Sequence, residues 1–473
     1  MRIISRRGLL AAGAAAALAM TGPPRPAHAT ATRDRRLVAG PARVPLVGAP
    51  YPDTDVWGYG GTVPGPEIRV RQGEQLRVTV ENRLAESTTV HWHGVRLPNP
   101  MDGVPHLTQA PIDPGAAFVY EFDVPDAGTY WYHPHQRSFE QVARGLYGAL
   151  VVEERAPLPV DRDILWVLGD WRLLSDGGIG ADFGNRMETA MAGRLGNTVT
   201  VNGRIIDEFP VRSGERIRLR LVNAATARIF GLEFRDHRPV VIALDGQPVE
   251  PHAPEDGRVV LGPAQRVDLV LDLTGTPGGR SMVADTFYRG LEYRLLDLVY
   301  DAEPFRQRPP DGPVALAPNP LPEPDLTAAV RHEVVLRGGM MGSMGGMMGG
   351  MGGVGHMMGT TGGMGMAWTI NGFAATGHDM SPMLELKQGR SYVLALANET
   401  AWWHPMHLHG HVFRVITRNG TPTRHRAWRD TVLMAPRERV EIAFVADNPG
   451  DWMIHCHVLD HQNGGMMGVL QVA

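Results

Sequence analysis

The chain has a single cysteine, Cys456, in 473 residues. One thiol cannot form an intramolecular disulfide, so the fold does not depend on disulfide bonds. In an oxidising compartment an unprotected thiol is a liability. Two interpretations of Cys456 therefore stay open at this point, a buried inert thiol and a thiolate bound to a metal ion.

Long apolar runs and an excess of charge are also absent. The apolar stretch at residues 9–20 is much shorter than the roughly 20 residues needed to span a bilayer, and nothing after Met20 is typical of a membrane span. The formal net charge is −4, which favours neither nucleic acid nor a membrane surface as a partner. We predict no nucleic-acid partner and no membrane span.

The first 29 residues predict export. The pair Arg6 and Arg7 precedes the alanine-rich run, and Ala27-His28-Ala29 offers a small-x-small cleavage site. The arginine pair resembles a twin-arginine signal, which directs the export of folded proteins. We expect residues 1–29 to be a signal peptide and the mature protein to be periplasmic or otherwise exported.

Three similar segments divide the rest of the chain. VRQGEQLRVTVEN starts at Val70, VRSGERIRLRLVN at Val211 and LKQGRSYVLALAN at Leu386. Each places a glycine before an alternating apolar run, which is typical of a turn that leads into a half-buried strand. With few helical stretches, this repeat predicts an all-β protein of three homologous antiparallel sandwiches. The expected bounds are 40–155 for domain 1, 160–300 for domain 2, 301–330 for a proline-rich linker, and 331–473 for domain 3 with an insertion at 338–366.

Histidine pairs occur at matching places in the first and third repeats. HWH at 91–93 and HLH at 407–409 have the same offset from their repeats, and so do HPH at 133–135 and HCH at 455–457. The second repeat has no histidine at either place. A role in stabilising the fold would require histidine in all three copies. The asymmetry therefore predicts a site shared by domains 1 and 3.

The four His-x-His pairs predict a metal cluster. Residues i and i+2 of a strand project to the same face, so each pair can offer two imidazoles together. Eight imidazoles exceed the coordination number of one ion, and imidazole suits zinc, copper, iron and nickel. The candidate ligands are His91, His93, His133, His135, His407, His409, His455 and His457.

Cys456 favours copper as the metal. On a strand its side chain faces away from those of its two histidine neighbours, so it serves a different centre. His404, His461 and Met466 are close in sequence. Two imidazoles, one thiolate and a weak axial thioether describe a blue-copper electron-transfer site. Tetrahedral zinc is the alternative, but the methionine and the through-bond path from Cys456 to the cluster favour copper.

With these residues in place, the chain resembles a three-domain multicopper oxidase, similar to bacterial laccases and cuprous oxidases. HWHG at 91–94, HPH at 133–135, HPMHLHGH at 404–411 and HCHVLDHQNGGMM at 455–467 carry the resemblance, which covers essentially the whole mature chain. It implies cupredoxin-like Greek-key domains and four copper ions, one of type 1, one of type 2 and two of type 3. The implied ligands are His404, Cys456, His461 and Met466 for type 1, His91 and His407 for type 2, and His93, His133, His135, His409, His455 and His457 for the type 3 pair. His411 matches no ligand and is expected to be structural or to support a neighbouring ligand.

The resemblance also implies the reaction. Single electrons are taken at the type 1 centre, and O₂ is reduced to two waters at the cluster. Asp102 resembles the family's acidic residue near the cluster, and a turn aspartate before Gly103 is the alternative. Where some relatives have an acidic proton relay, this chain has Gln462. Asp460 lies nearby, with simple solvation as one interpretation.

The segment 338–366 holds ten methionines and fourteen glycines. So much glycine predicts a flexible loop. It is either a low-complexity insertion or a thioether surface for extra Cu(I), with His356 assisting. Cuprous oxidases resembling this chain carry such an insertion. However, Trp402 and Trp403 stand where they have other residues before the type 1 histidine, and these aromatic rings could pack over the copper or line a pocket for organic substrates.

These features leave the substrate open. Cu(I), phenols or both are the expected reductants, with copper tolerance as the role. A laccase for aromatic substrates without a role in copper homeostasis is the alternative. A non-catalytic copper-sequestering or scaffold protein is a third candidate, although every ligand position of the family is intact here.

Overall fold

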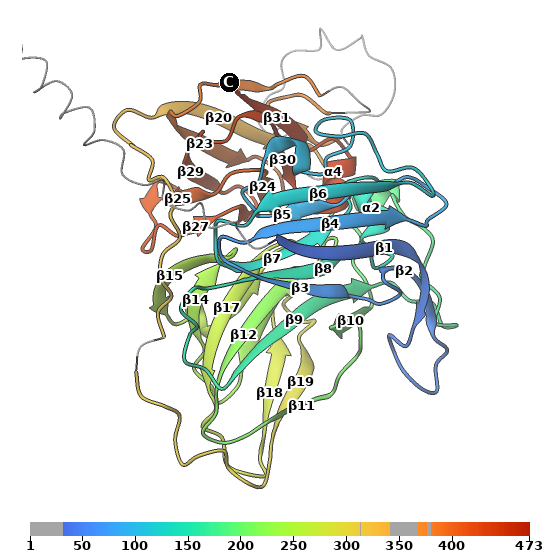
Figure 1. The fold of residues 1–473 in the computed structure, drawn as a ribbon, viewed down its shortest axis with the longest axis vertical. Coiled ribbons are helices and arrows are strands. Elements are labelled where there is room, and N and C mark those ends of the chain that lie inside the picture. Colours follow the sequence, from blue (N-terminus) through green and yellow to red (C-terminus); the bar gives the residue numbers. More distant parts are fainter. Residues whose placement is uncertain (1–31, 313, 341–366, 376–379) are drawn as a thin grey trace, which may run out of the picture.

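The structure is a computed structural model that describes residues 32–312, 314–340, 367–375 and 380–473 (Figure 1). The expected signal peptide and most of the methionine-rich insertion lie outside these residues. Within them, no helix is long and apolar enough to cross a membrane. Six β-sheets form three groups that follow one another along the chain, and helices are few and short.

The first group holds two four-stranded sheets, drawn in blue and cyan in Figure 1. Strand order is β2-β1-β4-β6 in one and β3-β8-β7-β5 in the other. The bounds are β1 Thr32–Val44, β2 Thr54–Tyr59, β3 Gly65–Arg71, β4 Gln75–Asn82, β5 His91–His93, β6 Ala117–Asp123, β7 Gly128–His133 and β8 Gly148–Glu153, with η1 Asn99–Met101 and α2 Ser138–Gln141.

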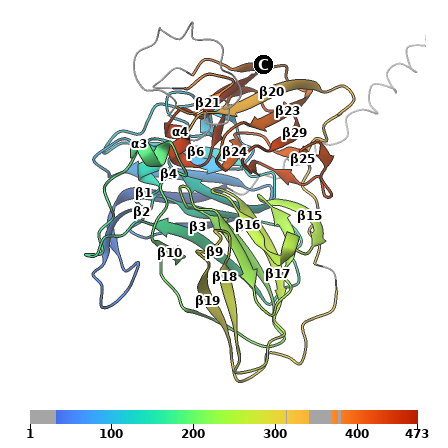
Figure 2. The same ribbon diagram turned by 180° about the vertical axis from the view of Figure 1, so that it is seen from behind.

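The second group, green to yellow, has a six-stranded sheet β10-β9-β12-β17-β14-β15 and a five-stranded sheet β11-β19-β18-β13-β16. Figure 2 shows α3, which precedes β10, beside α4 of the third group. The bounds are β9 Arg162–Trp171, α3 Arg186–Thr189, β10 Thr198–Val201, β11 Glu208–Val211, β12 Arg216–Asn223, β13 Phe230–Phe234, β14 Val240–Leu244, β15 Gln247–His252, η2 Glu255–Gly257, β16 Val259–Leu261, β17 Arg266–Asp272, β18 Arg280–Asp285 and β19 Tyr293–Tyr300.

The third group, orange to red, has a sheet β21-β20-β23-β29-β25-β26, with β27 also paired to β25, and a sheet β22-β31-β30-β24-β28. The bounds are β20 Val330–Arg337, β21 Thr369–Ile370, β22 Leu384–Leu386, β23 Ser391–Asn398, β24 His404–Leu408, β25 Phe413–Arg418, β26 Thr421–Pro422, β27 Trp428–Arg429, β28 Thr431–Met434, β29 Arg439–Val445, β30 Gly450–Cys456, α4 Leu459–Asn463 and β31 Met467–Val472.

The three sequence repeats occupy the same place in the three groups. They form β4, β12 and β23, and each pairs in parallel with the first strand of its group, respectively β1, β9 and β20. On the other side each pairs antiparallel with β6, β17 or β29. The all-β prediction of three homologous sandwiches is confirmed. The sheets are mixed rather than antiparallel throughout, because the first strand of each group pairs in parallel with the repeat, and the domain bounds stay a prediction.

The second repeat departs from the expected half-buried strand. In β4 buried residues alternate with half-buried ones, but all eight residues of β12 are buried. Its second face carries Arg218 and Arg220, which pair with Asp268 at 2.6 and 3.2 Å. Arg220 also donates to Thr129 Oγ1 of β7 at 2.9 Å. Ion pairs and a neighbouring domain therefore cover the face that the sequence pattern assigned to solvent.

Candidate metal centres

Equivalent strand pairs position the histidines in domains 1 and 3. β5 pairs with β7, which sets His91 opposite His133. β24 pairs with β30, which sets His407 opposite His455. The corresponding pair among the described strands of domain 2, β13 with β18, contains no histidine. The match between repeats inferred from the sequence thus holds in three dimensions.

The four His-x-His pairs converge on one buried region. Nε2 of His455 lies 3.1 Å from Nε2 of His409 and 3.4 Å from Nε2 of His135. Nε2 of His457 lies 3.4 Å from Nε2 of His133. All eight side chains belong to residues at most 6% exposed. Ligand atoms fall within 4.8 Å of one another in the sets His91/His93/His407, His93/His133/His457 and His135/His409/His455.

The protonation state of these imidazoles favours the binding of cations. Burial is the main cause that lowers the pKa of His93, His133, His135, His407, His409, His455 and His457. A neutral imidazole offers a lone pair, and lone pairs that face one another repel unless a cation lies between them. Nε2 of His91, Nε2 of His407 and Nδ1 of His93 are also buried without a hydrogen-bond partner. The residues therefore fit a cluster of several metal ions.

For several of these rings a backbone carbonyl selects the nitrogen that faces the cluster. Nδ1 of His91 donates to Asp102 O, and Nδ1 of His407 donates to Asp430 O, both at 2.8 Å. Nδ1 of His455 donates to Cys456 O at 2.9 Å. Donation from Nδ1 fixes the tautomer whose Nε2 lone pair is free for a metal ion.

Asp102 lies against the cluster as the resemblance implied. It is 1% exposed, its Oδ2 accepts from Nδ1 of His409 at 2.8 Å, and its Oδ1 is 3.2 Å from Nδ1 of His91. It also follows η1 in a tight turn, because a Cβ at Gly103 would lie 1.9 Å from Val90 O. The turn therefore serves to place the carboxylate at two histidines.

Cys456 faces a second group of side chains. Its Sγ lies 3.4 Å from Nδ1 of His404 and 3.6 Å from Nδ1 of His461, and these two nitrogens are 3.1 Å apart. Met466 is fully buried, and its backbone bonds to Cys456 N and His461 O at 3.0 Å. Burial raises the pKa of the Cys456 thiol, and a bound metal ion would replace the thiol proton. Two imidazoles, a thiolate and a thioether fit copper.

Sequence reasoning missed the groups that surround this second site. Thr400 Oγ1 lies 2.8 Å from Nε2 of His404, and Nε2 of His461 donates to Met191 O at 2.8 Å. The ring of Trp368 packs on His461, with 4.2 Å between ring centroids, and on His404 at 5.1 Å. Met191 follows α3, far away in sequence, so no local pattern could reveal it. The place of Trp368 just after the methionine-rich segment was the only available signal.

The two tryptophans before His404 lie beside that segment and domain 2. Nε1 of Trp402 donates to Met340 O at 2.9 Å. Trp403 is 37% exposed and packs edge to face on Phe287, with 5.4 Å between ring centroids. The ring that contacts the two candidate type 1 histidines is Trp368 rather than either of these.

Three polar residues near the histidines are now placed. The interpretation of Asp460 as solvated is wrong, because it is 1% exposed and its Oδ2 accepts from Arg194 N at 2.8 Å. Burial raises the pKa of Asp460 to about 6. Gln462 accepts from Ser138 Oγ at 3.1 Å, and its Nε2 is 3.4 Å from Nδ1 of His135. His411 is buried, packs on Trp452 and donates from Nδ1 to His409 O at 3.2 Å, and its role stays a prediction.

Asp430 is a further buried carboxylate that the sequence analysis missed. Its Oδ1 lies 3.1 Å from Nε2 of His93, and its side chain pairs with Arg266 of domain 2 at 2.5 Å. Burial alone would raise the pKa of Asp430, but the Arg266 guanidinium outweighs burial and lowers it. Asp430 is therefore ionised beside a candidate ligand.

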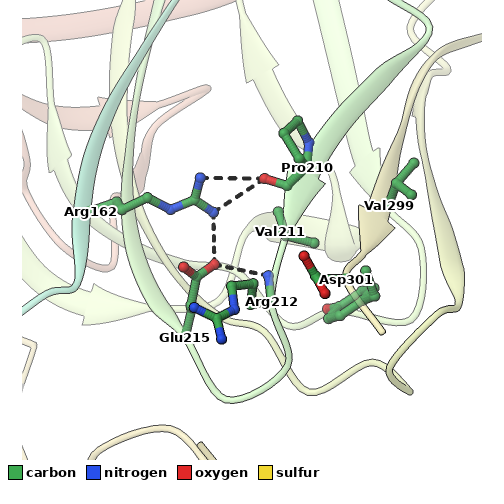
Figure 3. A pocket seen from close by; sticks show the side chains of 8 residues that line it. Arg162, Pro210, Val211, Arg212, Glu215, Val299 and Asp301 are labelled. Carbon is green, nitrogen blue, oxygen red and sulfur yellow. Dashed lines mark hydrogen bonds and ion pairs between the residues drawn. The ribbon is translucent and has the colours of Figure 1, made fainter. Parts of the chain in front are cut away.

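An open depression on domain 2, of about 330 Å³, contains none of these residues (Figure 3). Two of its charged groups pair with each other, since Arg162 bonds to Glu215 at 2.7 Å, and Arg162 also bonds to Pro210 O at 3.3 Å. It offers no candidate ligand, so the histidine clusters are the candidate site.

Comparisons with known proteins agree with this donor set. Sequence models of a family described as multicopper oxidase match residues 46–157, 163–302 and 356–473. Multicopper oxidase MmcO of Mycobacterium tuberculosis is 32% identical, over 96% of this chain and 90% of its own.

Two solved structures share the fold. The crystal structure of a multi-copper oxidase from Pseudomonas thermotolerans is 35% identical, with a TM-score of 0.81, and the match covers 94% of this chain and all of the other. A multicopper oxidase from Campylobacter jejuni, described as a metallo-oxidase, is 27% identical with a TM-score of 0.76, covering 93% and 91%. This likeness confirms the predicted fold of three consecutive cupredoxin-like Greek-key domains.

Proposed function

Because the chain belongs to the multicopper oxidase family of oxidoreductases, we propose that it couples one-electron oxidation of a reductant at a type 1 copper to four-electron reduction of O₂ to water at a trinuclear copper cluster. His404, Cys456, His461 and Met466 would hold the type 1 ion. His91 and His407 would hold the type 2 ion. The type 3 pair would be held by His93, His133, His135, His409, His455 and His457.

The observation that carries the proposal is the alternation of side chains at the end of β30 and just beyond. The Sγ of Cys456 lies with His404 and His461, while the neighbouring His455 and His457 point into the other histidine group. The peptide units on either side of Cys456 therefore give two covalent paths between the two sites. Such a path suits a residue that passes electrons from one centre to the other.

Asp102 supplies the second chemical role. O₂ reduction consumes protons, and Asp102 is a buried carboxylate in contact with His91 and His409. We assign it to hold these imidazoles in the tautomers that bind metal and to pass protons toward the cluster. Gln462 cannot act as an acid where other members have a carboxylate, so Asp102 carries this role alone in the proposal.

We assign Cu(I) as the principal reductant, with copper tolerance as the role. His461 is fully buried, its Nε2–H is bonded to Met191 O, and Trp368 covers it, so an organic ring has no contact with it. Both described ends of the methionine-rich segment lie at this cover, because Met340 N donates to Ala190 O and Trp368 Nε1 donates to Thr189 O. Thioethers suit Cu(I). We therefore assign the methionines of residues 341–366, which lie outside the described residues, to bind extra Cu(I) and deliver it.

Oxygen uptake tests this assignment. The copper-loaded protein is supplied with Cu(I) or with a phenol, and compared with a variant in which the nine methionines of residues 341–366 are replaced by leucine, so that chain length is kept. We expect at least tenfold slower oxygen uptake with Cu(I), a loss of the size that follows when a group supporting a metal site is removed. Oxygen uptake with the phenol should not change. Turnover of the phenol alone by the parent protein would identify a laccase. Copper loading without any oxygen uptake would refute the oxidase and leave copper sequestration.

We also propose that residues 1–29 export the protein by the twin-arginine route to the periplasm or beyond. Copper taken up before export would travel with the folded chain. Replacing Arg6 and Arg7 by lysine should retain the unprocessed precursor inside the cell, and normal export of that variant would refute the route.

A further inference from the structure

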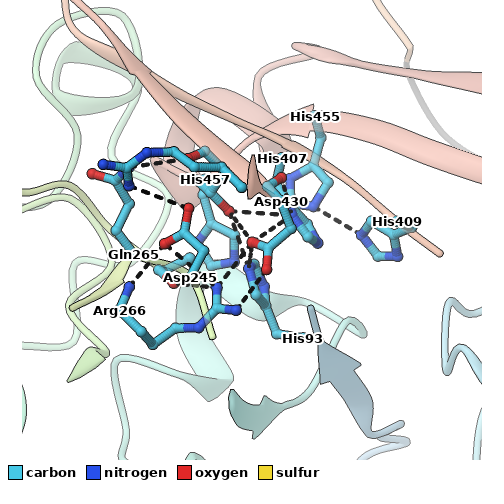
Figure 4. Close-up of polar contacts among 12 residues, drawn as sticks. His93, Asp245, Gln265, Arg266, His407, His409, Asp430, His455 and His457 are labelled. Atoms are coloured by element: carbon cyan, nitrogen blue, oxygen red, sulfur yellow. Dashed lines mark hydrogen bonds and ion pairs between the residues drawn. The ribbon is translucent and has the colours of Figure 1, made fainter. Parts of the chain in front are cut away.

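A buried arginine of domain 2 lies beside the histidine cluster (Figure 4). Arg266, at the start of β17, is fully buried. Its Nη1 and Nη2 donate to Oδ1 and Oδ2 of Asp430 at 2.9 and 2.5 Å, and its Nε donates to Thr129 O at 3.1 Å. Thr129 belongs to β7 of domain 1, and Asp430 lies between β27 and β28 of domain 3. One guanidinium therefore joins all three domains.

Asp430 connects this arginine to two candidate ligands. Its Oδ1 accepts from Nε2 of His93 at 3.1 Å, and its backbone oxygen accepts from Nδ1 of His407 at 2.8 Å. The nitrogens left over are Nδ1 of His93 and Nε2 of His407, and both are buried without a hydrogen-bond partner. His93 and His407 both belong to one of the sets of residues whose ligand atoms converge. The position of Asp430 thus determines which nitrogen of each ring faces the cluster.

The chain around the ion pair is shaped to admit it. Gly94, the glycine of HWHG, has a φ of +83°, and a Cβ there would lie 2.3 Å from Oδ2 of Asp430 and 2.4 Å from Nη2 of Arg266. A side chain at position 94 would therefore collide with the ion pair, and the positive φ also favours glycine there. On the opposite side, Gln265 Nε2 donates to Thr431 O at 2.9 Å. Residues of domains 1 and 3 therefore both pack against the segment that carries Arg266.

Arginine suits this position better than lysine. Its planar fork binds both oxygens of a carboxylate and so fixes the plane of that carboxylate. The nearby Arg429 is engaged with Asp245 at 3.4 Å, and Asp245 also accepts from Arg266 N at 3.0 Å. Without Arg266, the Asp430 carboxylate would stay buried with no cation bonded to it, which is strongly unfavourable.

We propose that Arg266 is a positioning residue for the trinuclear cluster, through which the ligand-free domain 2 orients Asp430 and so sets the metal-binding nitrogens of His93 and His407. The inference rests on the proposed function, because it concerns how that cluster is held. It gives domain 2 a part in metal binding that its lack of histidine pairs does not suggest.

The test compares Arg266→Gln with Arg218→Gln as the matched control. Arg218 is also a buried arginine of domain 2 paired with a buried aspartate, Asp268 at 2.6 Å, but no bond joins it to Asp430. Each protein is loaded with copper and dialysed against a graded series of chelator concentrations. Copper per chain, the electron paramagnetic resonance signal of the type 2 ion and the blue absorption of the type 1 ion are then measured.

For Arg266→Gln we expect the type 2 signal to be lost at a chelator concentration about 10–100-fold lower than in the parent, as for other residues that orient metal ligands. The blue absorption should not change. Arg218→Gln should lower the melting temperature of the metal-free protein and leave the type 2 signal at the parent's chelator resistance. If Arg266→Gln does not fold, Arg266→Lys decides, since it keeps the charge and loses the fork.

Unchanged chelator resistance of the type 2 signal in the folded Arg266 variant would overturn the inference. An equal loss of chelator resistance in Arg218→Gln would overturn the inference too, because removing any buried ion pair of domain 2 would then weaken the type 2 site. The proposed function fails separately, namely if the parent protein itself binds no copper at the histidine cluster.

Discussion

At the scale of single residues, Cys456 is the candidate ligand that no other amino acid can replace closely. Serine has nearly the same shape, but its hydroxyl is a hard and weakly acidic ligand where copper requires a thiolate. We expect Cys456→Ser to lose the blue absorption and one copper per chain. Its oxygen uptake with either reductant should fall at least 10²-fold, as when an essential group is removed from an active site. Visible spectroscopy, metal analysis and an oxygen electrode measure these three effects.

Ile454→Val on the same strand is the matched control for Cys456→Ser. Ile454 is also buried, and its side chain projects to the same face two residues away. This change removes one methylene group and should cost about 1 kcal/mol of unfolding free energy while the blue absorption stays. Retained turnover in Cys456→Ser would contradict the role given to the residue.

The residues that could be predicted are those with a repeated local pattern. Every candidate ligand belongs to a short motif, and the repeats made the eight cluster histidines informative. Asp430, Arg266 and Trp368 have no such pattern. Their partners lie far away in sequence, such as Arg266 with Asp430, 164 positions apart. Contacts of that kind depend on how domains pack, which a single sequence does not express.

At the scale of the element, β30 has two functions that depend on its register with β24. Met406 lies opposite Cys456, and His407 lies opposite His455. Because side chains alternate between the two faces, a shift by one residue exchanges the faces of every side chain beyond it. We expect insertion of one alanine between Ile454 and His455 to abolish at once both the blue absorption of the type 1 ion and the copper held by the type 3 pair, counted by metal analysis, because Cys456, His455 and His457 all change face.

The control for this insertion is one alanine added after Gly420. That residue lies in the exposed turn between β25 and β26, and a Cβ there meets nothing within 4 Å. Both copper signals should stay, since turns tolerate added residues. Survival of either signal after the β30 insertion would show that the register does not couple the two sites.

Element types were easier to predict than the environment of each element. The alternating pattern of the three repeats gave strands at β4, β12 and β23, all at equivalent places. The same pattern gave the wrong exposure for β12, because Arg218 and Arg220 are covered by acidic partners and by domain 1. From sequence alone, a charged residue in a strand is predicted to be exposed. Its ion-pair partner is brought to it only by tertiary packing, so the sequence pattern does not reveal that it is buried.

For the molecule as a whole, the metal sites join the two ends of the chain. Domains 1 and 3 contribute four candidate cluster histidines each, and one buried apolar core includes residues of both, such as Val80 and Val440. The core of domain 2, which includes Leu219, forms a separate cluster. Ligands from two domains can converge only when those domains are docked, so metal binding favours the docked state over the unfolded one.

Removing copper should therefore lower the melting temperature. When the free copper concentration is 100 times the Kd of a site, binding at that site adds about 2.7 kcal/mol to the free energy of unfolding, provided that the unfolded chain does not bind copper. For a chain of this size that corresponds to an increase of several degrees. Scanning calorimetry of the copper-loaded and the chelator-treated protein measures the shift. The Cys456→Ser variant should keep most of it, because its type 1 site is lost while the histidines that hold domains 1 and 3 together are intact. Equal melting temperatures with and without copper would contradict a cluster shared between the two domains.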